Sequence, residues 1–437
     1  MNLIAGTQKS RVAYPKSEIG FGHECFSTTP PGYSEHPVDF VEAHGVWLKD
    51  ASGQVWFDAT GGSGAVNLGH GDERVRKAVH RQVDTLIHTG WNIATEIRRQ
   101  AVTRLALASG FTDPAVLSCL SGAEAVEAAC KVARAFTGQR DILAFEYGFH
   151  GKSGGALEVT WRESFRKYSG GDRPSEPLQV SKGEAGVSSL DPVANILEMR
   201  KRAKALPAAI IVEPVQVSEG IMDFGDAWLN ELIALCHRYN VLCIFDEIYT
   251  GFGRSGALFK CHRAGVMPDL LVVGKALGNG FPISAVLGCG ELLNSLPAGH
   301  HSSTFAGHPV SAAAANEVVR IMCEETPWSN VEPRGRRLVA GLHEIAKANP
   351  AIRVIRRDGL LIAFEFWSAA ADGTNVPDAV MANQFARAAF QSGVVVRTGG
   401  YNGAVVKLTP PITVSVAELD FLVDALCAAA HRILGAS

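Results

Sequence analysis

Lys275 and Asp246 each stand directly after a short apolar run, 270–274 and 241–245 respectively. An ammonium or a carboxylate buried at the end of a strand is costly unless something binds there. In open α/β sheets ligands lie beyond the carboxyl ends of the strands, so both side chains are expected to face one crevice. A lysine that forms a Schiff base, opposite an acid that pairs with a pyridinium nitrogen, is what pyridoxal phosphate requires. The pair therefore predicts a pyridoxal phosphate site, although a lone lysine at a strand end is more often a surface side chain.

Other polar residues follow neighbouring apolar runs. Glu213 ends the run 210–212 and is expected to support Asp246 through a hydrogen-bond relay. Ser121, Gly122 and Ala123 precede an amphipathic helix, and the N-terminus of a helix binds phosphate well. A Ser-Gly pair before a helix is also an ordinary cap, so this signal is weak by itself.

Aromatic and hydroxyl side chains complete the predicted cofactor contacts. Phe149 and His150 follow a strand-like run, where Phe149 would stack on the cofactor ring while Ile248 packs on its other face. Tyr249 would hydrogen-bond the phenolate oxygen of the ring, and Thr304 would offer its hydroxyl to the phosphate. Phe149 could equally be a buried core residue.

Length and composition limit the possible classes of protein. A chain of 437 residues exceeds the usual size of one hydrophobic core, so two domains are expected. The net charge of −3 gives no field for nucleic acid or for an anionic membrane surface. No apolar run has the length of a membrane span, and residues 1–20 lack an export signal. Nine cysteines without Cys-x-x-Cys spacing predict no metal site and favour the reducing cytoplasm.

The order of the apolar runs predicts an α/β fold. Runs without polar alternation, separated by helical patterns, indicate a largely parallel sheet between helices; they are 116–120, 142–145, 208–212, 241–245, 270–273 and 283–287. Residues 1–65 are expected to form an arm and a small β unit that packs with the small domain, and residues 66–315 the large cofactor-binding domain. Residues 316–437 then form a smaller α+β domain, with strands near 352–356, 360–366 and 394–397 and a last helix over 416–434.

These residues, in this order, resemble the class III (ω-) aminotransferases of the fold type I pyridoxal phosphate enzymes. The matching blocks are 64–71, 121–125, 149–151, 213–216, 246–256, the Lys275 segment, 303–305 and Pro410-Pro411. The resemblance implies a seven-stranded type of large-domain sheet and a homodimer in which Thr304 reaches the neighbouring subunit's cofactor. It also implies ping-pong transamination of an amine or amino acid with a keto acid or aldehyde, with Lys275 moving the proton.

The chain departs from the family pattern where substrate would bind. Tyr249 stands where the family usually has glutamine, and Lys407 stands where many members have a carboxylate-binding arginine. A lysine lacks the bidentate fork of arginine, so Arg397 is a candidate substitute. Ser63 and Trp91 are expected to contact substrate, and Trp91 could equally be a core or dimer-contact residue.

Two alternatives to transamination stay open. The same lysine serves amino-acid racemases or epimerases of this family, whose pattern the turn 399–403 and Ser218-Glu219 resemble, and an aminomutase would use the same residues. A non-enzymatic protein on this fold would be expected to lose Lys275 or Asp246, and both are present.

Overall fold

The computed structural model describes residues 38–167, 178, 182–183, 186–187, 189–370 and 372–434, so most of the predicted N-terminal arm lies outside it. In the described residues the central sheet has six strands, in the order β4-β13-β12-β11-β8-β5. Five run in one direction, and β13 is antiparallel to both of its neighbours. The strands are β4 (Pro114–Cys119), β5 (Ile142–Ala144), β8 (Ala209–Val212), β11 (Leu242–Asp246), β12 (Leu270–Val273) and β13 (Ser284–Cys289).

Helices cover both faces of this sheet because its strands are apolar on both faces. In β12, Leu270 and Val272 belong to one core cluster, and Leu271 and Val273 belong to the cluster on the opposite face. The first cluster includes α4 (Gly122–Thr137), α5 (Gly154–Val159) and α10 (Gly290–Leu293). The second includes α7 (Asp191–Arg202), α8 (Asp226–Arg238) and α11 (Pro309–Glu325). The predicted largely parallel sheet between helices is therefore confirmed.

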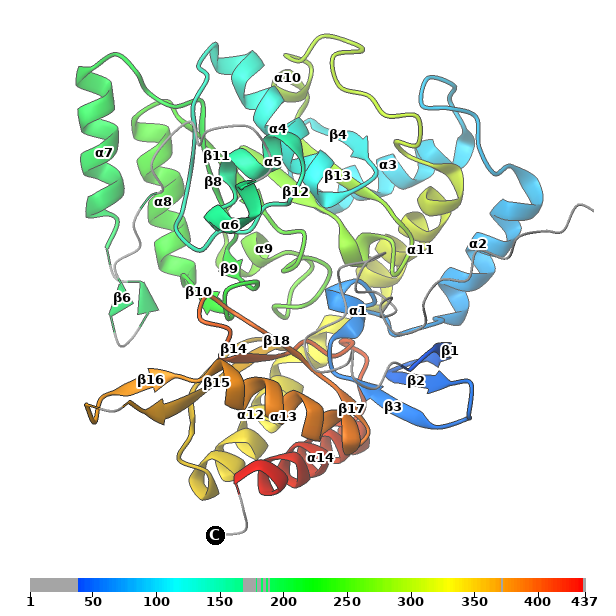
Figure 1. The fold of residues 1–437 in the computed structure, drawn as a ribbon. Helices are drawn as coiled ribbons and strands as arrows, with labels where there is room; N and C mark the ends of the chain where they lie inside the picture. Colours follow the sequence, from blue (N-terminus) through cyan, green and yellow to red (C-terminus); the bar gives the residue numbers. More distant parts are fainter. Residues whose placement is uncertain are drawn as a thin grey trace, which may run out of the picture.

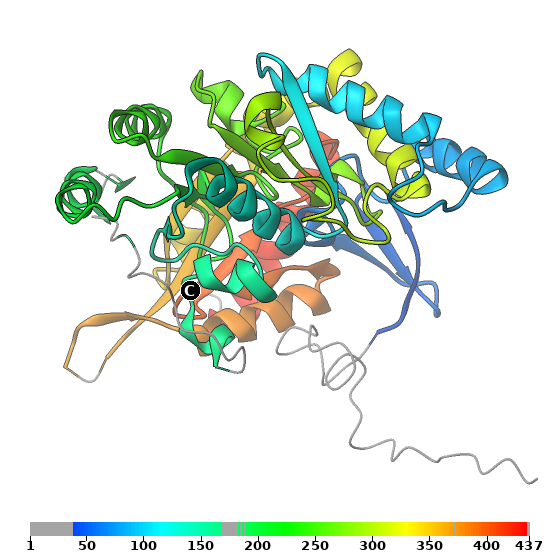
Figure 2. The ribbon, with the colours of Figure 1, turned by 90° about the horizontal axis from the view of Figure 1, so that it is seen from above.

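The remaining elements of this part lie around the sheet. Helices α2 (Glu73–Thr85) and α3 (Glu96–Ser109) pack with α11 at one end of the molecule, and α7 and α8 lie at the other (Figures 1 and 2). The shorter elements are α1 (Gly61–Gly64), α6 (Glu163–Arg166), α9 (Lys260–Ala264), the 3-10 helix η1 (Lys275–Leu277), β6 (Lys182–Gly183), β7 (Gly186–Val187), β9 (Val215–Gln216) and β10 (Met222–Asp223).

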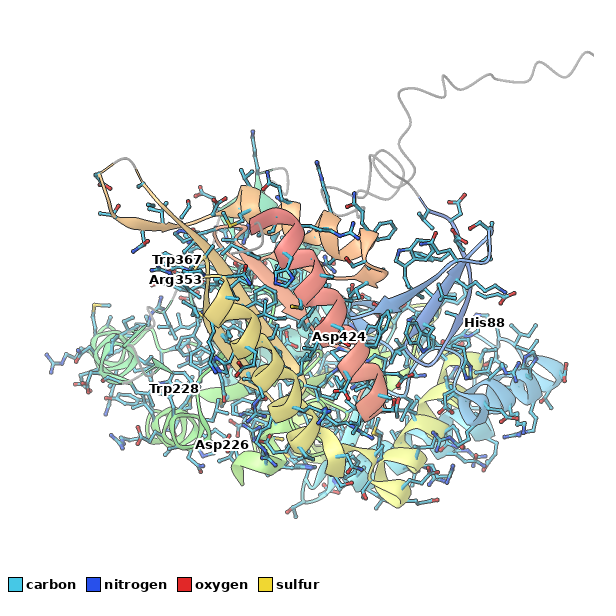
Figure 3. The ribbon with its side chains drawn as sticks, turned by 90° about the horizontal axis from the view of Figure 1, so that it is seen from below. His88, Asp226, Trp228, Arg353, Trp367 and Asp424 are labelled. Atoms are coloured by element: carbon cyan, nitrogen blue, oxygen red, sulfur yellow. The ribbon has the colours of Figure 1, made fainter. Side chains whose placement is uncertain are left out.

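A second, antiparallel sheet lies below the first in Figure 1. Its order is β14-β15-β19-β18, and β16 pairs with β15. Helices pack against it and against one another, as the sticks view from below shows for α12 and α14 (Figure 3). The elements are η2 (Pro327–Asn330), α12 (Val331–Ala348), β14 (Ile352–Asp358), β15 (Leu361–Ala369), β16 (Asn375–Pro377), α13 (Ala379–Gln391), β18 (Arg397–Gly399), β19 (Val405–Leu408) and α14 (Val416–Leu434).

An early and a late segment of the chain meet in a third sheet. Strands β1 (Phe40–His44), β2 (Trp47–Asp50) and β3 (Val55–Asp58) form an antiparallel unit, and β3 pairs in parallel with β17 (Val394–Val395). A hairpin turn at 50–53 joins β2 to β3, and a turn at Gly45 separates β1 from β2. The domain limits at 65/66 and 315/316 stay a prediction; α11 spans the second of these positions.

Among the described helices, none combines the length and the apolar character needed to cross a membrane.

Candidate active site

Lys275 lies where β12 passes into η1, and its backbone is in the left-handed region with φ 42°. This conformation costs a residue with a side chain about 1 kcal/mol or more, so the surrounding structure must hold Lys275 in it. Lys275 Nζ lies 3.8 Å from the centre of the Tyr249 ring. Burial lowers the pKa of Lys275 to about 8; the carboxylates of Asp246 and Glu213 oppose this shift, and the cations Arg397 and Arg254 add to it. A substantial share of uncharged, nucleophilic amine therefore exists near neutral pH.

Asp246 ends β11 and is 4% exposed. Its Oδ2 lies 2.8 Å from His150 Nδ1, and its Oδ1 accepts a hydrogen bond from Ile248 N at 3.1 Å. Both oxygens of the buried carboxylate are thus partnered, which fixes its orientation. The buried His150 Nε2 has no hydrogen-bond partner among the described residues.

Glu213 follows β8 and accepts a hydrogen bond from Phe149 N at 2.8 Å. Burial and the neighbouring Asp246 carboxylate raise the pKa of Glu213 well above its ordinary value. The described residues contain no hydrogen bond between Glu213 and Asp246, so the predicted relay is not direct. Instead, the consecutive residues Phe149 and His150 bond one carboxylate each. The same short segment therefore contacts both acids.

The predicted phosphate turn opens α4. Ser121 is the N-cap, with its hydroxyl accepting from Glu124 N, and its carbonyl accepts from Ser284 Oγ at 2.7 Å. A Cβ on Gly122 would lie 2.9 Å from Ile248 Cδ1, so a larger residue at this position would require the Ile248 side chain to shift. Ser121 is exposed, and Gly122 and Ala123 are partly exposed, leaving the helix N-terminus open to an anion.

Tyr249 is held by its hydroxyl, which lies 3.2 Å from Thr409 Oγ1. Burial raises the pKa of Tyr249, so the hydroxyl stays protonated. A hydrogen bond to a cofactor phenolate would require exchange of the Thr409 contact. A Cβ on Gly64 would lie only 2.3 Å from the Tyr249 ring, so the segment before α2 closes over this ring.

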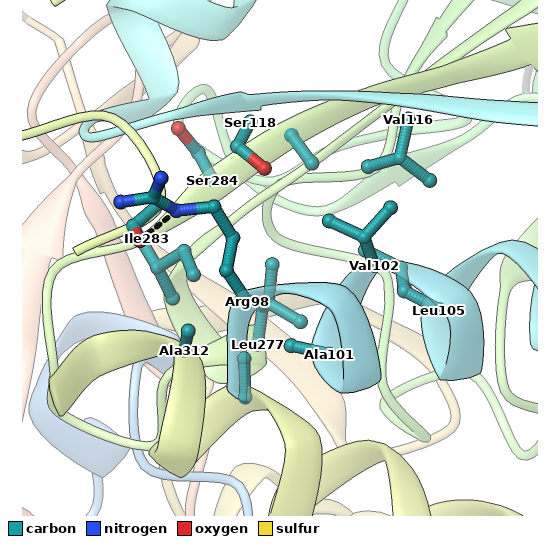
Figure 4. Close-up of a pocket in the computed structure, with 13 residues that line it drawn as sticks. Arg98, Ala101, Val102, Leu105, Val116, Ser118, Leu277, Ile283, Ser284 and Ala312 are labelled. Atoms are coloured by element: carbon teal, nitrogen blue, oxygen red, sulfur yellow. Dashed lines mark hydrogen bonds between the residues drawn. The ribbon is translucent and has the colours of Figure 1, made fainter. Parts of the chain in front are cut away.

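Thr304 is exposed and lies in the loop between α10 and α11. The end of this loop is fixed by Arg98 of α3, whose Nε donates to Gly307 O at 2.9 Å (Figure 4). Arg98 also lines a cavity of about 20 Å³ between α3, α11 and the sheet, which has room for about one water molecule. This cavity is too small for a substrate.

The predicted substrate residues come from both ends of the chain. Arg397 of β18 is exposed, and its Nη1 donates to Ser63 Oγ at 2.7 Å. Lys407 of β19 donates to Ser218 O at 3.0 Å, and burial lowers its pKa to about 8. Trp91 is 47% exposed, so the core reading of this residue is wrong for the single chain.

Sequence reasoning did not find Arg162, which pairs with Glu219. Arg162 Nη2 lies 2.9 and 2.7 Å from the two carboxylate oxygens of Glu219, and it also donates to Gly400 O. Glu219 is 8% exposed, and the guanidinium of Arg162 neutralises its carboxylate. No local motif marks Arg162, because its partners stand far from it in the sequence.

This arrangement fits pyridoxal phosphate. It offers an amine of lowered pKa, a partnered carboxylate, an open helix N-terminus and an imidazole with an unpartnered nitrogen. Together with a mostly parallel sheet between helices, these features define a pyridoxal phosphate enzyme of fold type I.

Comparison with known proteins narrows the class. The profile of the family "Aminotransferase class-III" matches residues 28–430, and the chain belongs to this family. It is a pyridoxal phosphate-dependent aminotransferase. It is 32% identical to the acetylornithine aminotransferase of Listeria innocua, over 91% of this chain and 96% of that protein. It is 33% identical to the 5-aminovalerate aminotransferase DavT of Pseudomonas putida, over 90% of this chain and 94% of that one.

Solved structures of aminotransferases have the same fold. An (S)-enantioselective omega-transaminase from Thermomicrobium roseum superposes with a TM-score of 0.82 at 28% identity, covering 92% of this chain and 94% of that chain. The ornithine aminotransferase of Toxoplasma gondii superposes with a TM-score of 0.81 at 25% identity, covering 94% and 92%. These relatives give no support to the predicted racemase, epimerase or aminomutase alternatives.

Proposed function

We propose that Lys275, Asp246 and Glu213 are the catalytic residues of this aminotransferase, which moves an amino group from an amine or amino acid to a keto acid or aldehyde by a ping-pong route. The observation that carries the proposal is the Lys275 amine, with its pKa lowered to about 8, at the strand end beside two buried carboxylates. When bound, pyridoxal phosphate supplies an aldehyde for amines and a ring that accepts electrons.

Each residue then has a task that its position supports. Asp246, oriented by His150, holds a proton at the ring nitrogen, and Glu213 remains protonated to a higher pH than an ordinary carboxyl group. The N–H groups of Gly122 and Ala123 would bind the phosphate, while Ile248 and Phe149 would pack against the ring. The Lys275 amine would carry a proton to and from the substrate carbon.

Arg397 is the proposed contact for a substrate carboxylate. Of the two candidate cations it is the exposed one, whereas Lys407 is half-buried and already donates to Ser218 O. Ser63 positions the guanidinium of Arg397. The named relatives act on acetylornithine and 5-aminovalerate, which carry a carboxylate at the end remote from the transferred amine. A substrate of this kind fits an arginine set apart from Lys275.

A cytoplasmic homodimer with Thr304 at the partner's phosphate is the assembly we propose. Its support is a group of exposed apolar side chains beside the Thr304 loop: Ile87, Trp91, Ile93 and Phe305 are 54%, 47%, 55% and 49% exposed. The rings of His88 and Phe305 are 5.0 Å apart, which joins the two segments. Figure 3 places His88 on the opposite side of the molecule from Arg353 and Trp367. An exposed apolar group of this size is typical of a protein interface.

The test uses single turnovers of the loaded enzyme. With a donor and no acceptor, each site should release one keto acid, and later addition of an acceptor should yield one amino product. Lys275→Ala should release none, whereas Lys131→Ala, a surface lysine on α4, should behave as the parent chain. Borohydride reduction and peptide mapping should place the cofactor on Lys275. A label on another lysine, or deuterium uptake at the donor carbon without any keto acid, would refute the proposal.

A further inference from the structure

Three potential metal ligands from distant parts of the chain meet beside the phosphate turn. Cys119 is the last residue of β4, Glu124 lies in the first turn of α4, and His301 lies in the loop between α10 and α11. Cys119 Sγ is 3.7 Å from His301 Nε2, which is 3.8 Å from Glu124 Oε1. All three ligand atoms lie within 4.8 Å of one another.

These separations suit a single tetrahedral ion. Zinc binds thiolate sulfur at about 2.3 Å and imidazole nitrogen or carboxylate oxygen at about 2.0–2.1 Å, so neighbouring ligands of a tetrahedral site stand about 3.3–3.6 Å apart. The two measured edges exceed this by only a few tenths of an ångström, which small side-chain rotations can close. The cysteine, histidine and carboxylate set also matches the ligand preferences of zinc, and it is too soft for calcium or magnesium.

The Glu124 carboxylate is oriented toward the site before any ion arrives. Glu124 Oε2 accepts a hydrogen bond from Leu120 N at 2.9 Å, which points Oε1 toward His301. Glu124 Oε1 is itself buried and has no hydrogen-bond partner among the described residues. A buried carboxylate oxygen without a hydrogen-bond partner is unfavourable, and a bound cation would remove this penalty. The Cys119 side chain is fully buried behind it, whereas Glu124 and His301 leave a partly exposed side.

A hydrogen bond between Cys119 and His301 is the simpler explanation of one contact. It leaves Glu124 Oε1 with only a 3.8 Å ion-pair contact to His301, which is beyond hydrogen-bond distance and requires a protonated imidazole. A shared ion accounts for all three side chains at once.

We propose that Cys119, Glu124 and His301 bind one zinc ion, with water in the fourth position. Binding replaces the proton of the Cys119 thiol with the metal and releases that proton to solvent, and no electron is transferred. Ser121 and Gly122 stand between two of the ligands, and Thr304 stands three residues after the third. The ion therefore links the loop of Thr304 to the phosphate turn. Metal binding itself does not depend on the aminotransferase roles proposed above.

The cysteine spacing in the sequence predicts no metal site, and the proposed zinc site departs from that prediction. Its single cysteine is part of an apolar strand, and the histidine follows 182 residues later, so no ligand spacing marks it. Only the packing of the loop between α10 and α11 onto the start of α4 brings the ligands together.

The test is a cobalt titration of the full-length, cofactor-loaded enzyme after treatment with a chelator. Co²⁺ should bind with a stoichiometry of one per chain and give a near-ultraviolet sulfur-to-metal band, and Zn²⁺ should abolish that band by displacement. Cys119→Ser should eliminate the band, and His301→Ala and Glu124→Gln should each weaken zinc affinity at least tenfold. The matched controls Cys323→Ser and His300→Ala, an exposed cysteine and the neighbouring exposed histidine, should bind as the parent chain does.

Several outcomes would overturn the proposal. These are the absence of any band at millimolar Co²⁺, a band that survives in Cys119→Ser, or equal losses in His300→Ala and His301→Ala. Because Cys119 is buried, its variant is first compared with the parent chain by circular dichroism. If that variant unfolds, His301→Ala decides the matter, since His301 lies in a loop.

Discussion

The pH dependence of cofactor attachment tests the environment assigned to Lys275. Burial lowers the pKa of this lysine to about 8, so the uncharged amine predominates above that pH in the folded chain. About a tenth of the amine is uncharged at pH 7 and about nine tenths at pH 9, so attachment should accelerate about tenfold and then level off. A lysine with the ordinary pKa would instead gain about a hundredfold over the same range and about a further sevenfold between pH 9 and 10.

The assay mixes enzyme freed of cofactor with pyridoxal phosphate in a stopped-flow instrument between pH 6 and 10 and follows the absorbance of the bond to Lys275. A parallel series with N-acetyl-lysine corrects for titration of the cofactor itself. Arg397 is one of the cations that lower this pKa, so Arg397→Ala should move the midpoint to higher pH. A corrected rate that still rises about sevenfold between pH 9 and 10 would show that the amine is not held as the structure places it.

Three further outcomes are expected. Arg397→Ala should raise KM about 10- to 100-fold for donors with a remote carboxylate, because a hydrogen bond to a charged group contributes about 1.5–3 kcal/mol; equal losses for donors without a carboxylate would contradict this role. Asp246→Asn should bind cofactor but lose at least about a hundredfold in kcat, measured at saturating donor, since a neutral amide holds the ring proton poorly. Gly64→Ala should lower the free energy of unfolding by about 2–4 kcal/mol in urea titrations, because its Cβ would strike the Tyr249 ring and its φ is 77°. Gly138→Ala has open space at φ 68° and should lose only about 1 kcal/mol; equal losses would show that the Tyr249 contact is unimportant.

The central strands could be predicted from the sequence because a strand buried on both faces is apolar at nearly every position. The run 270–273 is apolar throughout and is buried throughout in β12. The ends of such runs locate Lys275 and Asp246, since parallel strands bring their carboxyl ends to one edge. The direction of β13 could not be predicted in this way, because an apolar run reads the same whichever way the strand points. The turn at Gly45, which separates β1 from β2, could not be predicted either, because the residues on both sides of it form one continuous strand pattern in the sequence.

Contacts between side chains were less predictable than strand ends. The sequence placed Glu213 near Asp246 but could not show that Phe149 and His150 bond one acid each, because backbone N–H groups carry no mark in the sequence. In α4, Phe136 continues the apolar pattern but is 45% exposed, because the helix extends past the edge of the core there. The pairing of Arg162 with Glu219 depends on how two loops pack, which no local pattern encodes.

The pairing of β3 with β17 has a consequence for biosynthesis. Strand β17, which completes the third sheet, begins at Val394, long after Val55 has left the ribosome. At a translation speed of about 5–20 residues per second, the edge of β3 waits roughly 20–70 seconds for its partner. Ser63 meets Arg397 only at the same late moment. The nascent enzyme therefore carries an open strand edge for most of its synthesis, and chaperones that shield such edges should bind it during this interval.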